Sequence, residues 1–258
     1  LLRNPMADPY FIGTSAGAAV GATAALLLPL SVGFLGFGLV PVLAFIGALT
    51  AVLVVYSLAR VDGKAPVITL LLAGFVVSSL LIAVMTLLIT INERVQVNLR
   101  QLLSFLMGGF GTNDWAQLAV VTPMIIFGLV ASRFYAQVLD AFTLGEEGAS
   151  YLGIQVEREK LILIGLGALL TGAAVSLSGL VGFVGLMVPH AVRMVVGPSH
   201  RIMVPASAIA GAAFLVSADL LARVLLAPTE IPVGVLTALL GAPVFLYLLR
   251  RGGRQYVF

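Results

Sequence analysis

The chain has 258 residues, of which 60% are hydrophobic and only 10% are charged, and its formal net charge is +3. A soluble globular domain carries about 25% charged residues, so this composition excludes a water-soluble fold. The chain has no cysteine, which excludes disulfides and thiolate chemistry. We attribute the basic balance to loops between apolar segments, and we expect no nucleic-acid partner.

Uncharged apolar stretches follow one another along the whole chain. About 20 apolar residues are needed to cross a hydrocarbon core roughly 30 Å thick. The stretch from Leu161 to Val192 is too long for one crossing and contains several glycines and Pro189, so we divide it near Gly179. The sequence therefore predicts an all-α fold, a polytopic transmembrane bundle of about eight crossings that forms one domain over residues 1–258. The stretches cover residues 13–36, 39–59, 66–91, 115–132, 161–192, 202–218 and 231–249.

The basic residues predict which loops face the cytoplasm, because Lys and Arg in short loops are retained on that side. With the N-terminal end inside, Arg94, Arg100 and Arg223 lie outside or near the outer face. The other Lys and Arg residues lie inside, and both ends of the chain are then cytoplasmic. These inside residues are Arg3, Arg60, Lys64, Arg133, Arg158, Lys160, Arg193, Arg201, Arg250, Arg251 and Arg254.

Small residues interrupt two of the apolar stretches. Gly13, Gly17 and Gly21 recur every four residues, which predicts a smooth ridge for close helix packing. The glycine-rich run from Gly179 to Gly185 predicts a broken helix, which is tolerated at membrane depth only inside protein or beside a water-filled cavity. We expect this run to tolerate no added bulk.

The two histidines do not predict a metal site. A metal site built on His190 and His200 would need carboxylates beside them, and none is near in sequence. We therefore expect no metal, and a structural role at a helix end for Pro189 and His190.

The longest inside loop covers residues 134–160 and contains a short polar segment. Thr143 and Glu146 have the spacing of a capping box, which predicts a helix that begins at Thr143. Glu146 and Glu147 would lie in its first turn, where the helix dipole favours anions, and Gly153 would end it. The segment is either a connector or a docking element for a partner, and its length favours docking.

Two further features bear on function. Asp219 and Arg223 are four residues apart, which predicts an ion pair on one helix. The run Gly63-Lys64-Ala65 lacks the residues of a phosphate-binding loop. If the chain takes part in transport, any energy must then come from an ion gradient or from another subunit.

The ordered motifs resemble those of the permease family that imports ferric siderophores, haem and cobalamin, almost from end to end. The matching segments are Asn4 to Pro9, Gly13 to Gly17, Leu152-Gly153, Ser178 to Leu186, Val188 to His190, Ala218 to Arg223, Glu230 to Gly234 and Gly241 to Phe245.

The resemblance implies a function and its partners. Family members have ten crossings, so we expect the first two to be missing from this N-terminally truncated chain. It implies a homodimer with two cytoplasmic subunits that use ATP and Mg, an outer binding protein and surrounding membrane lipid. The chain itself would be no enzyme, would bind no cofactor and would lie in the bacterial inner membrane.

The resemblance also implies site residues. The crossing over residues 66–91 would line the path, followed by an outer helix from Val95 to Leu106. The Arg of the Ala-Arg motif, Arg223, would contact a carboxylate of the binding protein. Path candidates are Ser78, Ser79, Met85, Thr86 and Thr90, and the ATPase-coupling residues are Leu144, Gly145, Glu146, Glu147, Ala149, Leu152 and Gly153.

Several functions remain open at this point. An iron chelate, a ferric siderophore or haem, is the expected cargo, and cobalamin is the alternative within the family. A gradient-driven transporter would need ionisable groups near the membrane midplane, where only Asp219 is available. An intramembrane enzyme would need a catalytic set, which the sequence does not suggest.

Overall fold

The computed structural model describes residues 12–28, 37–110 and 114–252, with side chains up to residue 245. Within these ranges the regular structure consists of twelve helices and one isolated β-bridge between Val61 and Lys64. The predicted all-α fold is therefore confirmed.

Five helices are long and apolar enough to cross a membrane. Three shorter apolar helices accompany them: α1 (Thr14–Leu27), α10 (Val184–Val196) and α12 (Val233–Gly252). Together they correspond to the eight apolar segments of the sequence. At about 1.5 Å per residue, α1 and α10 are shorter than a hydrocarbon core of about 30 Å. The five long helices are α2 (Leu39–Ala59), α3 (Val67–Ile91), α6 (Trp115–Phe134), α9 (Val156–Ser178) and α11 (His200–Val224).

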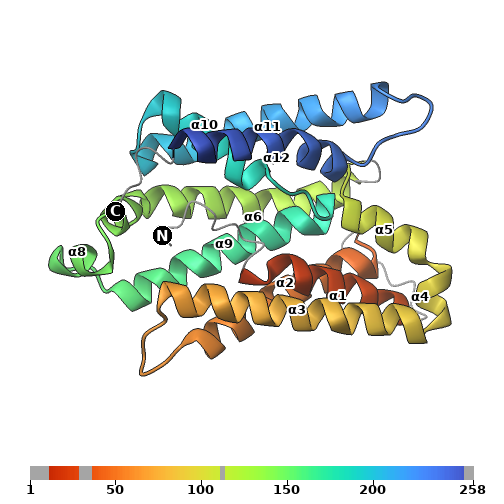
Figure 1. Cartoon of the computed structure of the whole chain (residues 1–258), viewed down its shortest axis with the longest axis horizontal. Helices are drawn as coiled ribbons and strands as arrows, with labels where there is room; N and C mark the ends of the chain where they lie inside the picture. Colours follow the sequence, from red (N-terminus) through yellow and green to blue (C-terminus); the bar gives the residue numbers. More distant parts are fainter. Residues whose placement is uncertain (1–11, 29–36, 111–113, 253–258) are drawn as a thin grey trace.

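The helices run roughly parallel or antiparallel and form three groups (Figure 1). Helices α1 to α3 lie on one side, α6 and α9 lie in the middle, and α10 to α12 lie on the other side. Helix α9 packs against both α2 and α6, and α6 packs against α11. The middle pair therefore joins the two outer groups.

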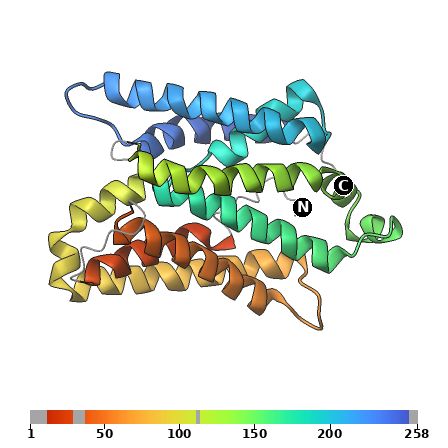
Figure 2. The same cartoon turned by 180° about the vertical axis from the view of Figure 1, so that it is seen from behind.

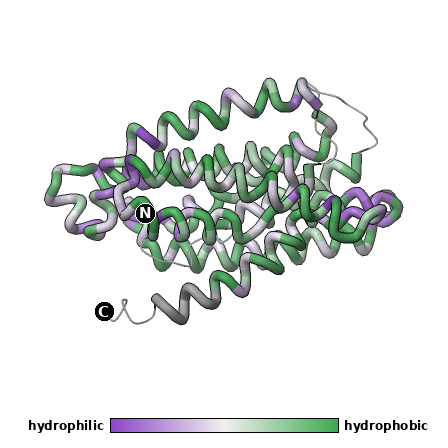
Figure 3. Tube along the Cα trace, turned by 90° about the horizontal axis from the view of Figure 1, so that it is seen from above, coloured by the Kyte–Doolittle hydropathy of each residue, from purple (hydrophilic) through white to green (hydrophobic). Residues whose placement is uncertain are grey.

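The surface along the helices is apolar. Hydrophobic residues dominate the length of the bundle, and hydrophilic residues gather at its two ends (Figure 3). Large side chains such as Ile68 and Phe75 on α3 are 73% and 64% exposed. Such exposure fits a bilayer, where lipid covers these side chains, and would be an aggregation risk in water.

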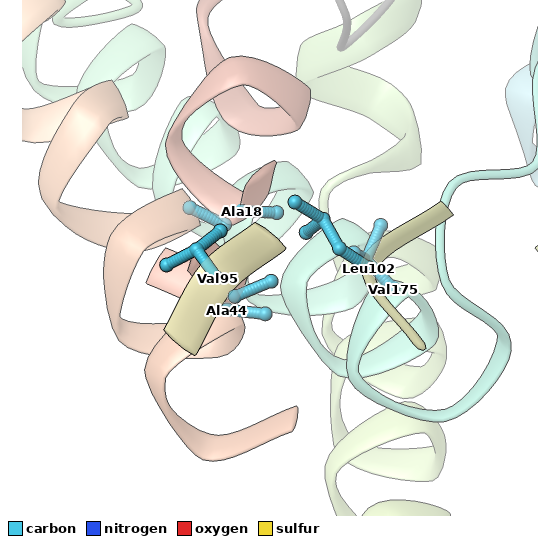
Figure 4. Packing of buried hydrophobic residues seen from close by; sticks show 7 residues of the cluster. Ala18, Ala44, Val95, Leu102 and Val175 are labelled. Atoms are coloured by element: carbon cyan, nitrogen blue, oxygen red, sulfur yellow. The ribbon is translucent and has the colours of Figure 1, made fainter. Parts of the chain in front are cut away.

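The buried core is built from small residues. Ala18 on α1 faces Ala44 on α2, and both lie close to Val95 and Leu102 from two short helices and to Val175 on α9 (Figure 4). The glycine ridge of the sequence lies in the same contact. A Cβ atom at Gly17 or Gly21 would collide with the α2 backbone. The ridge prediction is therefore confirmed, because only glycine allows this approach.

The segment that was expected to form one short outer helix forms two helices. Helix α4 (Glu93–Val97) begins at Asn92, whose side chain accepts hydrogen bonds from the amides of Arg94 at 3.0 Å and Val95 at 3.3 Å. Asn98 separates α4 from α5 (Leu99–Met107) and donates its side-chain amide to the Arg94 carbonyl at 2.8 Å. Asparagine favours such local bonds over helix continuation, so the single helix predicted from Val95 to Leu106 is wrong at this point.

The predicted break near Gly179 is confirmed. Helix α9 ends at Ser178 and α10 begins at Val184. The Leu180 amide donates to the Phe105 carbonyl at 3.1 Å, and the Gly109 amide donates to the Ser178 carbonyl at 2.8 Å. The break is therefore hydrogen-bonded to the end of α5, which satisfies its backbone at membrane depth.

Two expectations about this region need correction. Among the described residues, a Cβ atom at Gly185 would have no neighbour within 4 Å, so close packing does not extend over the whole run from Gly179 to Gly185. Pro189 lies inside α10 rather than at its end. Helix α10 begins at Val184, five residues before Pro189. The break precedes it because Gly179 and Phe183 both have positive φ angles that an α-helix does not contain.

Candidate functional site

One end of the bundle carries most of the basic side chains. Helix α8 (Glu146–Tyr151) and the α2–α3 loop project at this end, and α4 lies at the opposite end (Figures 1 and 2). The described basic residues near α8 are Arg60, Lys64, Arg133, Arg158, Lys160, Arg193 and Arg201, whereas Arg94, Arg100 and Arg223 belong to the other end. This asymmetry agrees with the predicted orientation.

Helix α8 begins one residue after a glycine and not at the predicted capping box. Its N-cap is Gly145, with φ 96° and ψ 166°, a region that only glycine adopts readily. The Thr143 hydroxyl donates to the Asp140 carbonyl at 2.6 Å instead of capping α8, so the capping-box prediction is wrong. Glu146 and Glu147 do lie in the first turn, and Gly153 with φ 80° follows the end of the helix, as predicted.

The two faces of α8 differ in chemistry. Ala149 is fully buried against Ala141 and Phe142 of α7 (Ala136–Phe142), which attaches α8 to the bundle. On the side of α8 that faces away from the bundle, Leu144 is 63% exposed and Tyr151 is 87% exposed. Leu152, Glu147 and Gly153 are exposed too. An exposed apolar group beyond the end of the helices is typical of a protein interface.

A buried lysine on α9 forms an ion pair with α8, and the sequence did not predict this contact. Lys160 on α9 is 1% exposed, and its Nζ atom lies 2.8 Å from Glu146 and 3.0 Å from Glu157. It also donates to the Ala65 carbonyl at 2.9 Å. The sequence does show Lys160 three residues after Glu157 at the start of an apolar stretch, a spacing that indicates the ion pair between these two residues but not the contacts to Glu146 and Ala65.

The structure brings a carboxylate to His200 from 60 residues away. The His200 backbone amide donates to Asp140 at 3.0 Å, and its ring Nδ1 lies 2.6 Å from the same oxygen atom. This pair joins α7 to the start of α11. Burial raises the pKa of Asp140, but the two His200 hydrogen bonds, the His200 charge and the Arg193 charge together lower it below its ordinary value.

We expect a pH effect from this pair. A carboxyl whose folded pKa is lowered stabilises the fold above its unfolded pKa of about 3.9, and the contribution disappears as pH falls below that value. Asp140→Asn should lower unfolding stability at pH 6 by about 1 kcal/mol or less, since the carboxylate is partly exposed. Thermal unfolding of the purified protein between pH 3 and 6 should then be less pH-dependent than in the wild type. A Glu147→Gln control should leave the wild-type profile unchanged, and an unchanged profile for Asp140→Asn would contradict the assignment.

Helix α3 carries a polar stripe. Ser79, Thr86 and Thr90 lie within about 40° of one another around the helix axis and are exposed. Each hydroxyl donates to the carbonyl four residues earlier, at 2.9, 2.9 and 2.8 Å. Their oxygen atoms still have acceptor capacity for another molecule.

The other two path candidates lie on a different side of α3. Met85 is half-buried, and the Ser78 hydroxyl is buried without a hydrogen-bond partner, facing Gly13 at the start of α1. The structure thus separates the five candidates into an exposed stripe of three and an inward pair.

Arg223 lies in the last turn of α11. Its Nε atom donates to Asp219 at 2.8 Å, which confirms the predicted ion pair. The Arg223 side chain is 42% exposed, so part of the guanidinium is free to meet another molecule. Helix α8 and Arg223 therefore lie at opposite ends of the bundle.

A family model described as the FecCD transport family matches residues 1–251. Among curated relatives, a cobalamin import system permease of Halobacterium salinarum is 47% identical over 96% of this chain and 65% of the relative. A hemin transport system permease of Yersinia pestis is 41% identical over 99% of this chain and 76% of its own length. A vitamin B12 import system permease of Escherichia coli K12 is 38% identical over 98% and 76%.

The fold agrees with that relation. A solved ABC transporter, assigned to the metal-chelate type and in an inward-facing conformation, matches with a TM-score of 0.85 and 29% identity. The match covers 96% of this chain and 78% of that one. The chain belongs to the FecCD transport family and is a multi-pass membrane protein. It spans 65% of the length of the Halobacterium relative.

Proposed function

We propose that this chain is the membrane-spanning permease subunit of an ATP-driven importer and forms the translocation path. The observation that carries the proposal is the family match over residues 1–251. The geometry supports it, because a small helix with an exposed apolar face projects from the basic end of the bundle.

The partners follow from the two ends of the bundle. A cytoplasmic ATP-binding subunit docks on α8 through Leu144, Tyr151 and Leu152, and Glu147 lies beside them. An outer binding protein docks at the end that carries Arg223. A second copy of the permease completes the path, and the α3 stripe of Ser79, Thr86 and Thr90 faces the cargo. The assembly lies in the inner membrane, with the α8 end and the C-terminus in the cytoplasm.

The cargo that we propose is a metal chelate. The relatives include permeases named for cobalamin and for hemin, with identities of 47% and 41% to this chain. The motifs alone suggested an iron chelate, whereas the higher identity supports cobalamin, so both stay candidates. Uptake of radiolabelled cyanocobalamin and of haem, each with its own binding protein, separates the two.

The test of this function uses proteoliposomes with ATP inside and the loaded binding protein outside. We expect uptake to stop when the ATP-binding subunit carries an inactivated catalytic site, while the membrane potential is held constant. Uptake that continues with the inactive subunit and follows an imposed ion gradient would show a secondary transporter instead.

We expect Arg223→Glu to weaken association with the binding protein about tenfold or more at low salt. An exposed ion pair contributes only about 0.2 to 1 kcal/mol, but opposed like charges at an interface cost more. Surface plasmon resonance with the permease in nanodiscs measures the affinity. A carboxylate-to-Arg change on the binding protein should restore part of it.

A purely internal role for Arg223 gives a different result. If Arg223 only neutralises Asp219, Arg223→Glu lowers the yield of folded permease and no change on the partner rescues it. Asp219→Asn combined with Arg223→Gln would then restore both yield and docking, which would contradict the docking role.

A further inference from the structure

A buried cation joins three segments that lie far apart in sequence. The Lys160 Nζ atom donates hydrogen bonds to Glu157 on α9 at 3.0 Å and to the Ala65 carbonyl at 2.9 Å, and it forms an ion pair with Glu146 on α8 at 2.8 Å. An ammonium group has three donors, so it can hold these three partners at the same time. Lys160 is 1% exposed, and such a buried charge is tolerated only when it is paired.

The Ala65 side of this junction is firmly held. The second Glu157 oxygen accepts the Ala65 amide at 3.0 Å, so both polar groups of Ala65 are bound to the α9 side chains. Ala65 is fully buried and precedes Pro66, the N-cap of α3. A movement of Lys160 or Glu157 therefore acts directly on the start of α3.

The α8 side of the junction is the weaker one. The Glu146 side chain is 40% exposed, so its ion pair with Lys160 is screened by water and can open. Glu157 is 29% exposed and makes two hydrogen bonds. If Glu146 withdrew, Lys160 would keep its two hydrogen-bond acceptors, so this ion pair can open without leaving an unpaired buried charge.

We propose that Lys160 is a positioning residue that transmits movement of α8 to the N-terminal end of α3. This inference rests on the proposed function, in which α8 docks the ATP-binding subunit and α3 lines the path. Glu146 and its neighbour Glu147 then have separate roles. Glu147 faces the partner, and Glu146 links α8 through Lys160 to the α2–α3 loop.

The test compares Glu146→Gln with the matched change Glu147→Gln, because both remove one carboxylate from the first turn of α8. Binding of the ATP-binding subunit, ATP hydrolysis and uptake are measured in the same reconstituted complex. For Glu146→Gln we expect the ATP used per imported cargo to rise at least tenfold, with affinity for the ATP-binding subunit unchanged. Glu147→Gln removes a group that faces the partner, so it should change the affinity for the ATP-binding subunit and not this ratio. Lys160→Arg keeps the charge and should preserve more uptake than Lys160→Met.

A distance measurement tests directly whether Glu146 links α8 to the α2–α3 loop. The chain has no cysteine, so in dimers that carry one labelled copy, spin labels at Ser150→Cys on α8 and Lys64→Cys in the α2–α3 loop report one distance. In otherwise wild-type complexes we expect a narrow distribution with and without ATP. Glu146→Gln should broaden it, because α8 then moves independently of the loop.

The outcomes separate this inference from the proposed function. Failure of the wild-type complex to import with ATP would overturn the proposed function and this inference with it. Normal wild-type import, with the same ATP-to-cargo ratio and distance distribution in Glu146→Gln, would overturn the Lys160 link alone. Equal losses in both glutamine variants, or weaker binding of the ATP-binding subunit to Glu146→Gln, would assign Glu146 to docking and also overturn the link.

Discussion

Gly179→Ala is expected to lower the unfolding free energy by about 3 kcal/mol, through backbone strain and overpacking of about 1 to 3 kcal/mol each. Gly179 has φ 65° and ψ −157°, which an alanine does not adopt readily. A Cβ atom there would also collide with the Phe105 carbonyl at the end of α5. The change should therefore separate α5 from the break between α9 and α10.

Gly185→Ala is the matched control, six residues along the same run. Its Cβ atom would meet no described residue within 4 Å, and alanine favours a helix over glycine by about 1 kcal/mol. Thermal unfolding in detergent and the yield of folded protein measure both variants. We expect a large loss for Gly179→Ala and none for Gly185→Ala. Equal behaviour would show that close backbone contact at the break does not determine stability.

Replacing both Leu144 and Leu152 with aspartate is expected to weaken binding of the ATP-binding subunit about 30-fold or more. An interface anchor often contributes about 2 kcal/mol, and 1.4 kcal/mol corresponds to a factor of ten in affinity, so a single anchor among the two already gives about 30-fold. Both side chains are exposed, and neither belongs to the buried cluster that attaches α8 to α7. The permease should therefore fold normally while ATP-driven uptake stops.

The control for this variant is Val97→Asp, at the opposite end of the bundle. Val97 is 83% exposed, so the substitution adds a charge without disturbing the packing of the core. Pull-down of the ATP-binding subunit and thermal unfolding are measured for both. Wild-type binding by the Leu144 and Leu152 variant would show that the subunit docks elsewhere.

The apolar segments of the sequence predicted the fold well, because each long helix needs its own run of uncharged residues. Residues 39–59 agree fully with α2, and residues 66–91 agree with α3 to one residue. Local polar chemistry was harder to predict. Asn92 and Asn98 divide the outer segment into α4 and α5 through side-chain bonds to the backbone, which periodicity does not report.

The site was predictable only where neighbouring residues define it. The Asp219–Arg223 pair and the acidic first turn of α8 depend on residues within four positions, and both were predicted. The Lys160–Ala65 bond and the Asp140–His200 pair join residues 95 and 60 positions apart. Such contacts depend on how helices pack, so spacing along the chain contains no signal for them.

The most direct test of the central claim is crosslinking from α8 to the ATP-binding subunit. Because the chain has no cysteine, Tyr151→Cys gives a single reactive thiol on α8, and Val97→Cys gives one at the other end. We predict that a bifunctional crosslinker joins the Tyr151→Cys permease to the ATP-binding subunit. The Val97→Cys permease should be joined only to the binding protein. Crosslinking of the ATP-binding subunit to Val97→Cys and not to Tyr151→Cys would contradict both the orientation and the docking role of α8.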